Sequence, residues 1–131
     1  MDVPSSFGRD GPGSDDEIAH AEAHVGLDLP WDDRSFLAEN GGGEGFIGEG
    51  YVKLASPTGL IEMHDGYEVG TFFEGLVLIG SHGAGEAFAI DRQSGRYLMT
   101  PFIGDAPDTR IDAGATLGEF LAFIERGAPV T

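Results

Sequence analysis

Two glycine-rich segments have the residue types that hold phosphate groups in nucleotide-binding proteins. Residues 43–48 match the pattern G-x-G-x-x-G, which binds a pyrophosphate when it follows a strand and opens a helix. Here helical sequence precedes the segment, strand-forming sequence follows it, and the neighbouring Glu44 and Glu49 would repel a phosphate. Residues 80–85 (GSHGAG) are not followed by the Lys-Ser or Lys-Thr of a Walker loop. We interpret the first segment as a flexible loop and the second as a hairpin connection.

The second glycine-rich segment contains Ser81 and His82, which together with Asp65 or Glu86 have the residue types of a hydrolase triad. A nucleophile adjacent in sequence to its base is rarely positioned to use it. We therefore predict that these side chains do not catalyse hydrolysis.

His20 and His24 stand four residues apart in helical sequence, the spacing of two metal ligands on one helix face. The acid between them, Glu22, is at the wrong position for the metalloprotease pattern H-E-x-x-H. At about 100° per residue both histidines point away from the apolar stripe, so we expect a solvated face. The sequence thus predicts that the chain is not an enzyme and has no metal site and no cofactor.

The elements that position these residues begin with a helix at Ser14. Residues 1–13 contain two prolines and three glycines, so we expect a disordered tail before a single domain of residues 14–131. Residues 14–17 (SDDE) match a capping box, and Gly26 supplies a left-handed end to the helix. Glu22 falls on the apolar stripe of this helix, where we expect it to pair with Arg34 or with backbone amides.

A second helix begins at Pro30, with Asp32 and Asp33 in its first turn, and ends at Asn40. A first strand is expected at residues 51–54. The clearest helix follows Thr116, where a second capping box precedes apolar residues at helical spacing. Between them, residues 104–114 read as a polar connection.

The hydrophobic centre of the chain is residues 76–103, which read as three strands joined by two glycine-bearing turns. Residues 76–79 are apolar at every position, so both faces of that strand are expected to be covered. In the next strand, Phe88 and Ile90 alternate with two alanines, which would let a helix approach closely. Helices bracketing a mostly antiparallel sheet predict an α+β fold.

The composition is strongly acidic. There are 23 Asp and Glu residues against 7 Lys and Arg, a formal net charge of -16. Direct nucleic-acid binding is disfavoured because phosphates must be met by clustered cations, whereas a basic protein partner is favoured. The alternative, that the charge only maintains solubility, stays open. The absence of cysteine and of a long apolar run predicts a cytoplasmic protein without disulfides or membrane contact.

Acidic residues gather between Glu39 and Glu74, where Lys53 is the single base. We expect this segment in loops flanking the sheet, within reach of a partner; a scattered solvated surface is the open alternative. The candidate partner-binding residues are Glu39, Glu44, Glu49, Glu62, Asp65, Glu68, Glu74, His82 and Glu86.

The order and spacing of several short blocks resemble the SUKH superfamily of bacterial immunity proteins and fungal regulators of cell-wall synthesis. The blocks that carry the resemblance are Ile18, Glu22, Gly26-Leu27, Leu29-Pro30, Phe36-Leu37, Asn40-Gly41-Gly42, Leu78-Ile79-Gly80, Gly83, Gly85-Glu86, Phe88-Ala89-Ile90-Asp91, Leu117 and Glu119-Phe120-Leu121. Two positions depart from the pattern: Asp33 stands where an aromatic residue is common, and His82 where an acid is usual. We expect Trp31 to supply the missing ring.

The resemblance implies a SUKH-like α+β domain without catalytic residues, many of whose bacterial members neutralise a toxin encoded beside them, frequently a nuclease. A nuclease surface is basic because it binds phosphates, so this agrees with the charge of the chain. The sequence thus predicts a cytoplasmic immunity protein that blocks a basic, nuclease-type toxin domain. The alternative is a regulatory scaffold that holds proteins or peptides in the sheet concavity and opposes no toxin.

Overall fold

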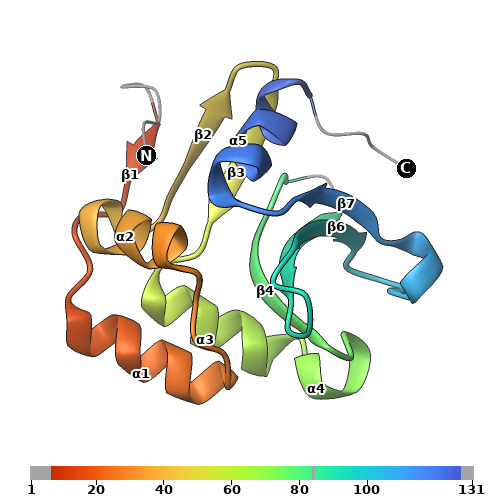
Figure 1. Cartoon of the computed structure of the whole chain (residues 1–131), viewed down its shortest axis with the longest axis horizontal. Coiled ribbons are helices and arrows are strands. Elements are labelled where there is room, and N and C mark those ends of the chain that lie inside the picture. Colours follow the sequence, from red (N-terminus) through yellow and green to blue (C-terminus); the bar gives the residue numbers. More distant parts are fainter. Residues whose placement is uncertain (1–6, 84, 128–131) are drawn as a thin grey trace.

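Seven antiparallel strands form one sheet whose strands lie in sequence order, from β1 at one edge to β7 at the other. The structure is a computed structural model and describes residues 7–83 and 85–127. Helices from both ends of the chain pack around the sheet (Figure 1), which confirms the predicted α+β fold. Among the described residues, no helix has the length and apolar composition needed to cross a membrane.

The elements follow one another as β1 (Gly8–Arg9), α1 (Asp15–Val25), α2 (Trp31–Asn40), β2 (Gly43–Ile47), β3 (Gly50–Leu54), α3 (Pro57–Gly66), α4 (Val69–Phe72), β4 (Leu76–Ser81), β5 (Glu86–Asp91), β6 (Tyr97–Pro101), a 3-10 turn (Pro107–Thr109), β7 (Ile111–Gly114) and α5 (Leu117–Glu125). Helices α1 and α2 lie between β1 and β2, and helices α3 and α4 lie between β3 and β4; the other neighbouring strands are joined by turns or by the short segment with the 3-10 turn.

The predicted capping box at the start of α1 is present. Glu17 donates its backbone N–H to the Ser14 hydroxyl, and the Glu17 carboxylate accepts from the Ser14 amide. Helix α5 begins at Thr116, whose hydroxyl accepts from the Glu119 amide, but the Glu119 carboxylate accepts from the amide of Ala115 instead of closing a box. Both helices therefore begin where the sequence predicts.

Strands β4, β5 and β6 form the centre of the sheet and are covered on both faces. We call the side that carries Val77, Phe88 and Tyr97 the α5 face, because these residues share one core with Phe120 of α5. The opposite side, which carries Ala87 and Ala89, is the α4 face, and Val69 of α4 and Phe73 just after it belong to the core on that side.

Residues 43–48 are not the flexible loop that the sequence suggests. They form β2 and the first residue of a two-residue turn, and β2 pairs with β3 from Gly43↔Leu54 to Ile47↔Gly50. The two runs flanking this turn have the spacing of a β-hairpin. The glycines of β2 admit the N-terminal segment, because a Cβ on Gly43 would lie 2.3 Å from the Gly8 carbonyl oxygen.

The two edges of the sheet also differ from expectation. At one edge Gly8 and Arg9 pair with Glu44 and Gly43, and Phe7 is buried beside them. Residues 7–13 therefore belong to the fold, whereas residues 1–6 of the expected tail lie outside the described part. At the other edge Ile111–Gly114 forms β7, within the segment that reads as a polar connection. Each edge strand is too short for periodicity to identify it.

Helices do not cover the sheet evenly. One side of the β2–β3 hairpin is left open, and the candidate site lies there. Ile47, Val52 and Leu54 of the β2–β3 hairpin are buried in the core on the α5 face. Helices α3 and α4 contact β4, whereas the other side of the β2–β3 hairpin leaves Phe46 63% exposed. Figure 1 shows α5 lying across β2 and β3 while α4 lies far from them.

Candidate partner-binding surface

The acidic residues predicted to lie in loops are mostly on regular elements. Glu39 is on α2, Glu44 on β2, and Glu62 and Asp65 on α3. Glu49 lies in the β2–β3 turn, while Glu68 and Glu74 flank α4; all seven residues are exposed. The loop prediction is wrong because residues 43–54 pair as a hairpin and residues 57–66 form a helix.

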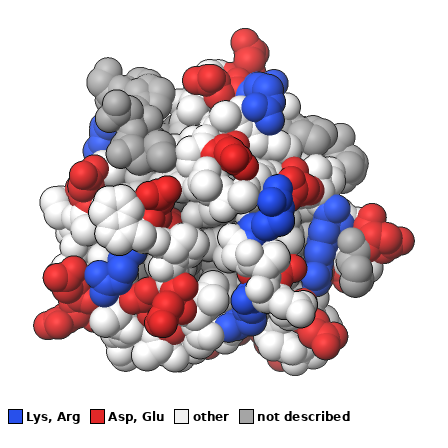
Figure 2. Space-filling view, in the orientation of Figure 1, with Lys and Arg blue, Asp and Glu red and all other residues white. Residues whose placement is uncertain are grey.

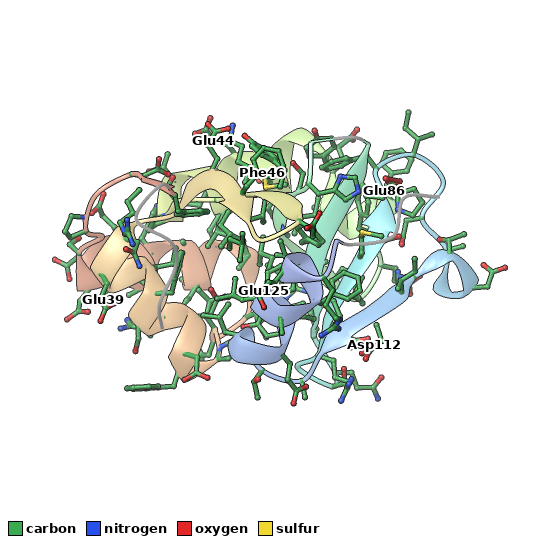
Figure 3. The ribbon with its side chains drawn as sticks, turned by 90° about the horizontal axis from the view of Figure 1, so that it is seen from above. Glu39, Glu44, Phe46, Glu86, Asp112 and Glu125 are labelled. Atoms are coloured by element: carbon green, nitrogen blue, oxygen red, sulfur yellow. The ribbon has the colours of Figure 1, made fainter. Side chains whose placement is uncertain are left out.

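These acidic residues are also spread over the molecule. Figure 3 places Glu39 at the α2 end and Glu44 beside Phe46 on β2, well apart from each other. Asp65 is engaged in a contact between helices, where its carboxylate lies 2.9 Å from Nε2 of His24. The rings of His24 and His64 also pack edge to face. His24 stays exposed, as predicted, and at the same time contributes to the contact between α1 and α3. His20 is exposed, as predicted.

His82 and Glu86 form a buried pair. Nε2 of His82 lies 3.1 Å from Oε1 of Glu86, and both side chains are nearly inaccessible. The contact is not aligned as a hydrogen bond. The His82 ring also packs against Phe88. These two residues hold the β4–β5 connection against the core, so they do not lie on the exposed surface to which the sequence assigns them.

The exposed part of the β2–β3 hairpin carries an aromatic pair next to an acid. Phe46 and Tyr51 face each other across the two strands, with ring centroids 5.4 Å apart and an edge-to-face angle of 74°. The Tyr51 hydroxyl donates to the Glu44 carboxylate, and this hydrogen bond raises the pKa of the Tyr51 phenol. Lys53 lies directly across from Glu44. We call these four residues, Glu44, Phe46, Tyr51 and Lys53, the open hairpin face.

A groove of about 420 Å³ adjoins the open hairpin face and shares Lys53 with it. Glu62 and Met63 of α3 form one wall, and Asp10 lies at the rim. Tyr67 and Phe102, whose stacked rings have centroids 4.7 Å apart, also line the groove. The groove combines apolar and charged lining, as binding grooves commonly do. Sequence reasoning does not find it, because its residues come from segments distant in the chain.

Five of the arginines are paired with groups of the same chain, some of them at the surface. Arg34 pairs with Glu22 and Asp15, Arg96 with Asp112, and Arg110 with Asp105. Arg92 donates to the carbonyls that end α1, and Arg9 donates to Asn40. On the side of the molecule drawn in Figure 2, the cations lie among acids and form no basic patch. The charge offered to a partner is accordingly dominated by carboxylates.

Glu22 has the structural role predicted for it. Its carboxylate accepts from the Leu29 amide at 2.8 Å and from Nε of Arg34 at 3.2 Å. It therefore joins α1 to the start of α2. Both expected kinds of partner, a backbone amide and Arg34, are present.

Asp33 is a buried carboxyl group, only 8% exposed. Burial raises its pKa to about 7, and the neighbouring Asp32 adds to the rise. The pKa of Tyr97 is raised mainly by burial and, to a smaller extent, by the negative charges of Asp33 and Asp32. The Tyr97 hydroxyl has no hydrogen-bond partner among the described residues. Trp31 is 78% exposed. The expectation that Trp31 supplies the missing ring is therefore wrong, and the acid itself is buried in α2.

Among the residues that the structure describes, no group of three or more His, Asp or Glu side chains could hold a metal ion. Ser81 lies on the rim of the groove, whereas His82 is buried beside Glu86. The arrangement suits recognition of a partner through an acidic and aromatic surface.

The model of the SMI1 / KNR4 family (SUKH-1) matches residues 12–122. A search of curated proteins finds no significant match to the chain.

Proposed function

Because the chain belongs to the SMI1/KNR4 (SUKH-1) family, whose members have immunity or related regulatory roles, we propose that it is an immunity protein. In this proposal it acts in the cytoplasm, binds a cognate bacterial toxin and blocks it without chemistry of its own. The target is a basic domain of the nuclease type. Binding covers the toxin's phosphate-binding surface, so the acidic protein competes with nucleic acid for the same cations.

The observation that carries the proposal is the imbalance of outward charge. The net charge is -16, and five arginines are held by partners within the fold. A field of this sign accelerates association with a basic protein and repels nucleic acid. Those two effects are what a nuclease inhibitor needs.

Co-expression with the product of the adjacent gene tests the proposal. We expect the chain to restore growth to cells that produce the toxin, and calorimetry to give a one-to-one complex. The association rate should fall steeply with added salt, because surface fields are screened beyond about 10 Å at 0.1 M. Failure to restore growth, together with no heat of binding, would refute the immunity role.

A regulatory scaffold is the second candidate function, and the groove beside the open hairpin face favours it. Such a groove can hold a peptide of a host protein as well as part of a toxin. The two candidates differ in their genetic context and in their effect on growth. A scaffold predicts a gene without a toxin beside it and a deletion phenotype in the absence of any toxin.

A further inference from the structure

We propose that the open hairpin face and the adjoining groove form one docking surface for an extended basic segment of the partner protein. In this arrangement a lysine or arginine of the partner lies between Glu44 and the ring of Phe46. An apolar side chain of the same segment enters the groove near Tyr67 and Phe102. The inference rests on the proposed function, because that function supplies the basic character of the partner. It assigns binding to one contiguous surface and not to the acidic residues dispersed between Glu39 and Glu74.

Strand register makes the surface continuous. Glu44 is paired with Lys53, Phe46 with Tyr51, and Lys53 in turn with Ser81. Paired residues and residues two apart on a strand share one face of a sheet. Lys53 and Ser81 both line the groove. The surface therefore runs without interruption from Phe46, across Lys53, to the groove.

Exposure of aromatic rings marks the surface as a site of contact. Phe46 on the hairpin is 63% exposed, and Tyr67 on the groove is 43% exposed. The core-facing residues of the same hairpin, such as Val52 and Ile47, are buried under α5. Figure 3 shows Glu44 and Phe46 together on one side of the hairpin, with Glu125 of α5 on the other side. Aromatic side chains of this kind supply much of the binding energy at protein interfaces.

The charges on the surface select a cationic segment. Glu44 lies beside the aromatic pair, and Asp10 and Glu62 lie on the groove. Lys53 is the cation among these lining residues. The Tyr51 hydroxyl orients the Glu44 carboxylate next to the Phe46 ring. A guanidinium or ammonium group placed there would gain both an ion pair and contact with an aromatic face.

The dimensions fit an extended chain. The Phe46–Tyr51 pair and the Glu44–Lys53 pair are two residues apart along the strands, which corresponds to about 7 Å. The step from Lys53 to its neighbour Ser81 adds about 5 Å. Side chains on one side of an extended segment repeat every ~7 Å, so residues two to four apart would reach from the Glu44–Phe46 end to the groove at Ser81. We therefore choose a peptide with arginine and phenylalanine two residues apart as a probe.

The first experiment titrates ¹⁵N-labelled protein with acetyl-Arg-Ala-Phe-amide and, as a matched control, with acetyl-Glu-Ala-Phe-amide. We expect amide shifts of Phe46, Tyr51, Lys53 and Ser81 with the arginine peptide, and at least about tenfold weaker binding of the glutamate peptide. Glu44→Lys should weaken the arginine peptide about tenfold, whereas Glu39→Lys, the same charge change on α2, should leave it within about twofold. Absence of shifts at these residues, or equal shifts elsewhere, would overturn the inference.

The second experiment separates this inference from the proposed function. Hydrogen exchange of the complex with the adjacent gene product should show protection of β2, β3 and the residues around Tyr67. A complex whose protected region lies elsewhere would overturn the docking surface and leave the immunity role standing. If that product does not bind while the arginine peptide maps to the surface, the toxin assignment fails and the surface is supported.

Discussion

Replacement of Asp33 by asparagine should stabilise the protein, and the gain should grow as the pH rises. Asp33 is buried in the first turn of α2, where its neighbour Asp32 is also acidic. Asparagine has nearly the shape of the protonated carboxyl group but cannot ionise. The substitution therefore removes the cost of holding a charge in the interior and changes the packing little.

The sign and size follow from the pKa of the Asp33 carboxyl group, which burial raises from 3.8 to about 7. The folded protein holds this proton more tightly than the unfolded chain, so the free energy of unfolding falls as the pH rises from about 4 to 7. At 1.36 kcal/mol per pKa unit the full loss is about 4 kcal/mol. This is an upper limit, since a small rearrangement that hydrates the carboxylate would reduce it.

Urea unfolding at several pH values, followed by circular dichroism, measures this loss. Trp31 is too exposed for its fluorescence to report unfolding well. Relative to the wild type, Asp33→Asn should gain less than about 1 kcal/mol at pH 4 and about 4 kcal/mol at pH 8. Asp28→Asn, which removes one charge from an exposed position, is the matched control and should show no such growth. Equal gains at both pH values would refute the account of Asp33.

Three further predictions concern stability, and the first two have a control variant in the chain. Glu22→Ala should lower the free energy of unfolding in urea by about 1–3 kcal/mol, because the Leu29 amide and Arg34 lose their acceptor. Glu39→Ala on the exposed side of α2 is the control and should change this free energy by less than about 0.5 kcal/mol. Gly80→Ala should lower the free energy of unfolding by about 1–3 kcal/mol, because the new Cβ would lie 2.1 Å from the Lys53 carbonyl oxygen. Gly70→Ala is the control, because a Cβ there meets open space and should not destabilise the protein. A loss of stability at both positions would contradict the packing argument. Ser14→Ala should lower the melting temperature by removing the acceptor of the Glu17 amide, at a cost of about 1 kcal/mol, and an unchanged melting temperature would show that the cap is dispensable.

The elements with strong local signals could be predicted from the sequence. Capping residues and apolar periodicity locate α1 and α5, and the continuous apolar run locates β4. The β2–β3 hairpin is missed because its glycines read as a loop, although two five-residue runs around a two-residue turn are a hairpin pattern. Strands β1 and β7 depend on pairing with a neighbour and have little local preference of their own.

The candidate surface was predictable only in its chemistry. An acidic partner-binding protein follows from the charge and from the family resemblance, but the location does not. Phe46 and Tyr51 become neighbours through strand register, and Phe102, which follows β6, reaches the groove where its ring stacks on Tyr67. Glu86 and Asp33 are buried, whereas the seven acids between Glu39 and Glu74 are exposed. Composition cannot show which acids are buried.

Titration of the adjacent toxin's activity with the wild-type protein and with the double variant Glu44→Lys, Phe46→Ala tests the central claim most directly. Both changed side chains are exposed, so the variant should fold; the lost contacts with Tyr51 and the new charge opposite Lys53 should cost about 1–2 kcal/mol, which urea unfolding measures. We predict that the wild type abolishes toxin activity at a one-to-one ratio and that the variant leaves most of it at the same concentration. Undiminished toxin activity with excess wild type would contradict the proposed function, and equal inhibition by the two proteins would contradict the docking surface.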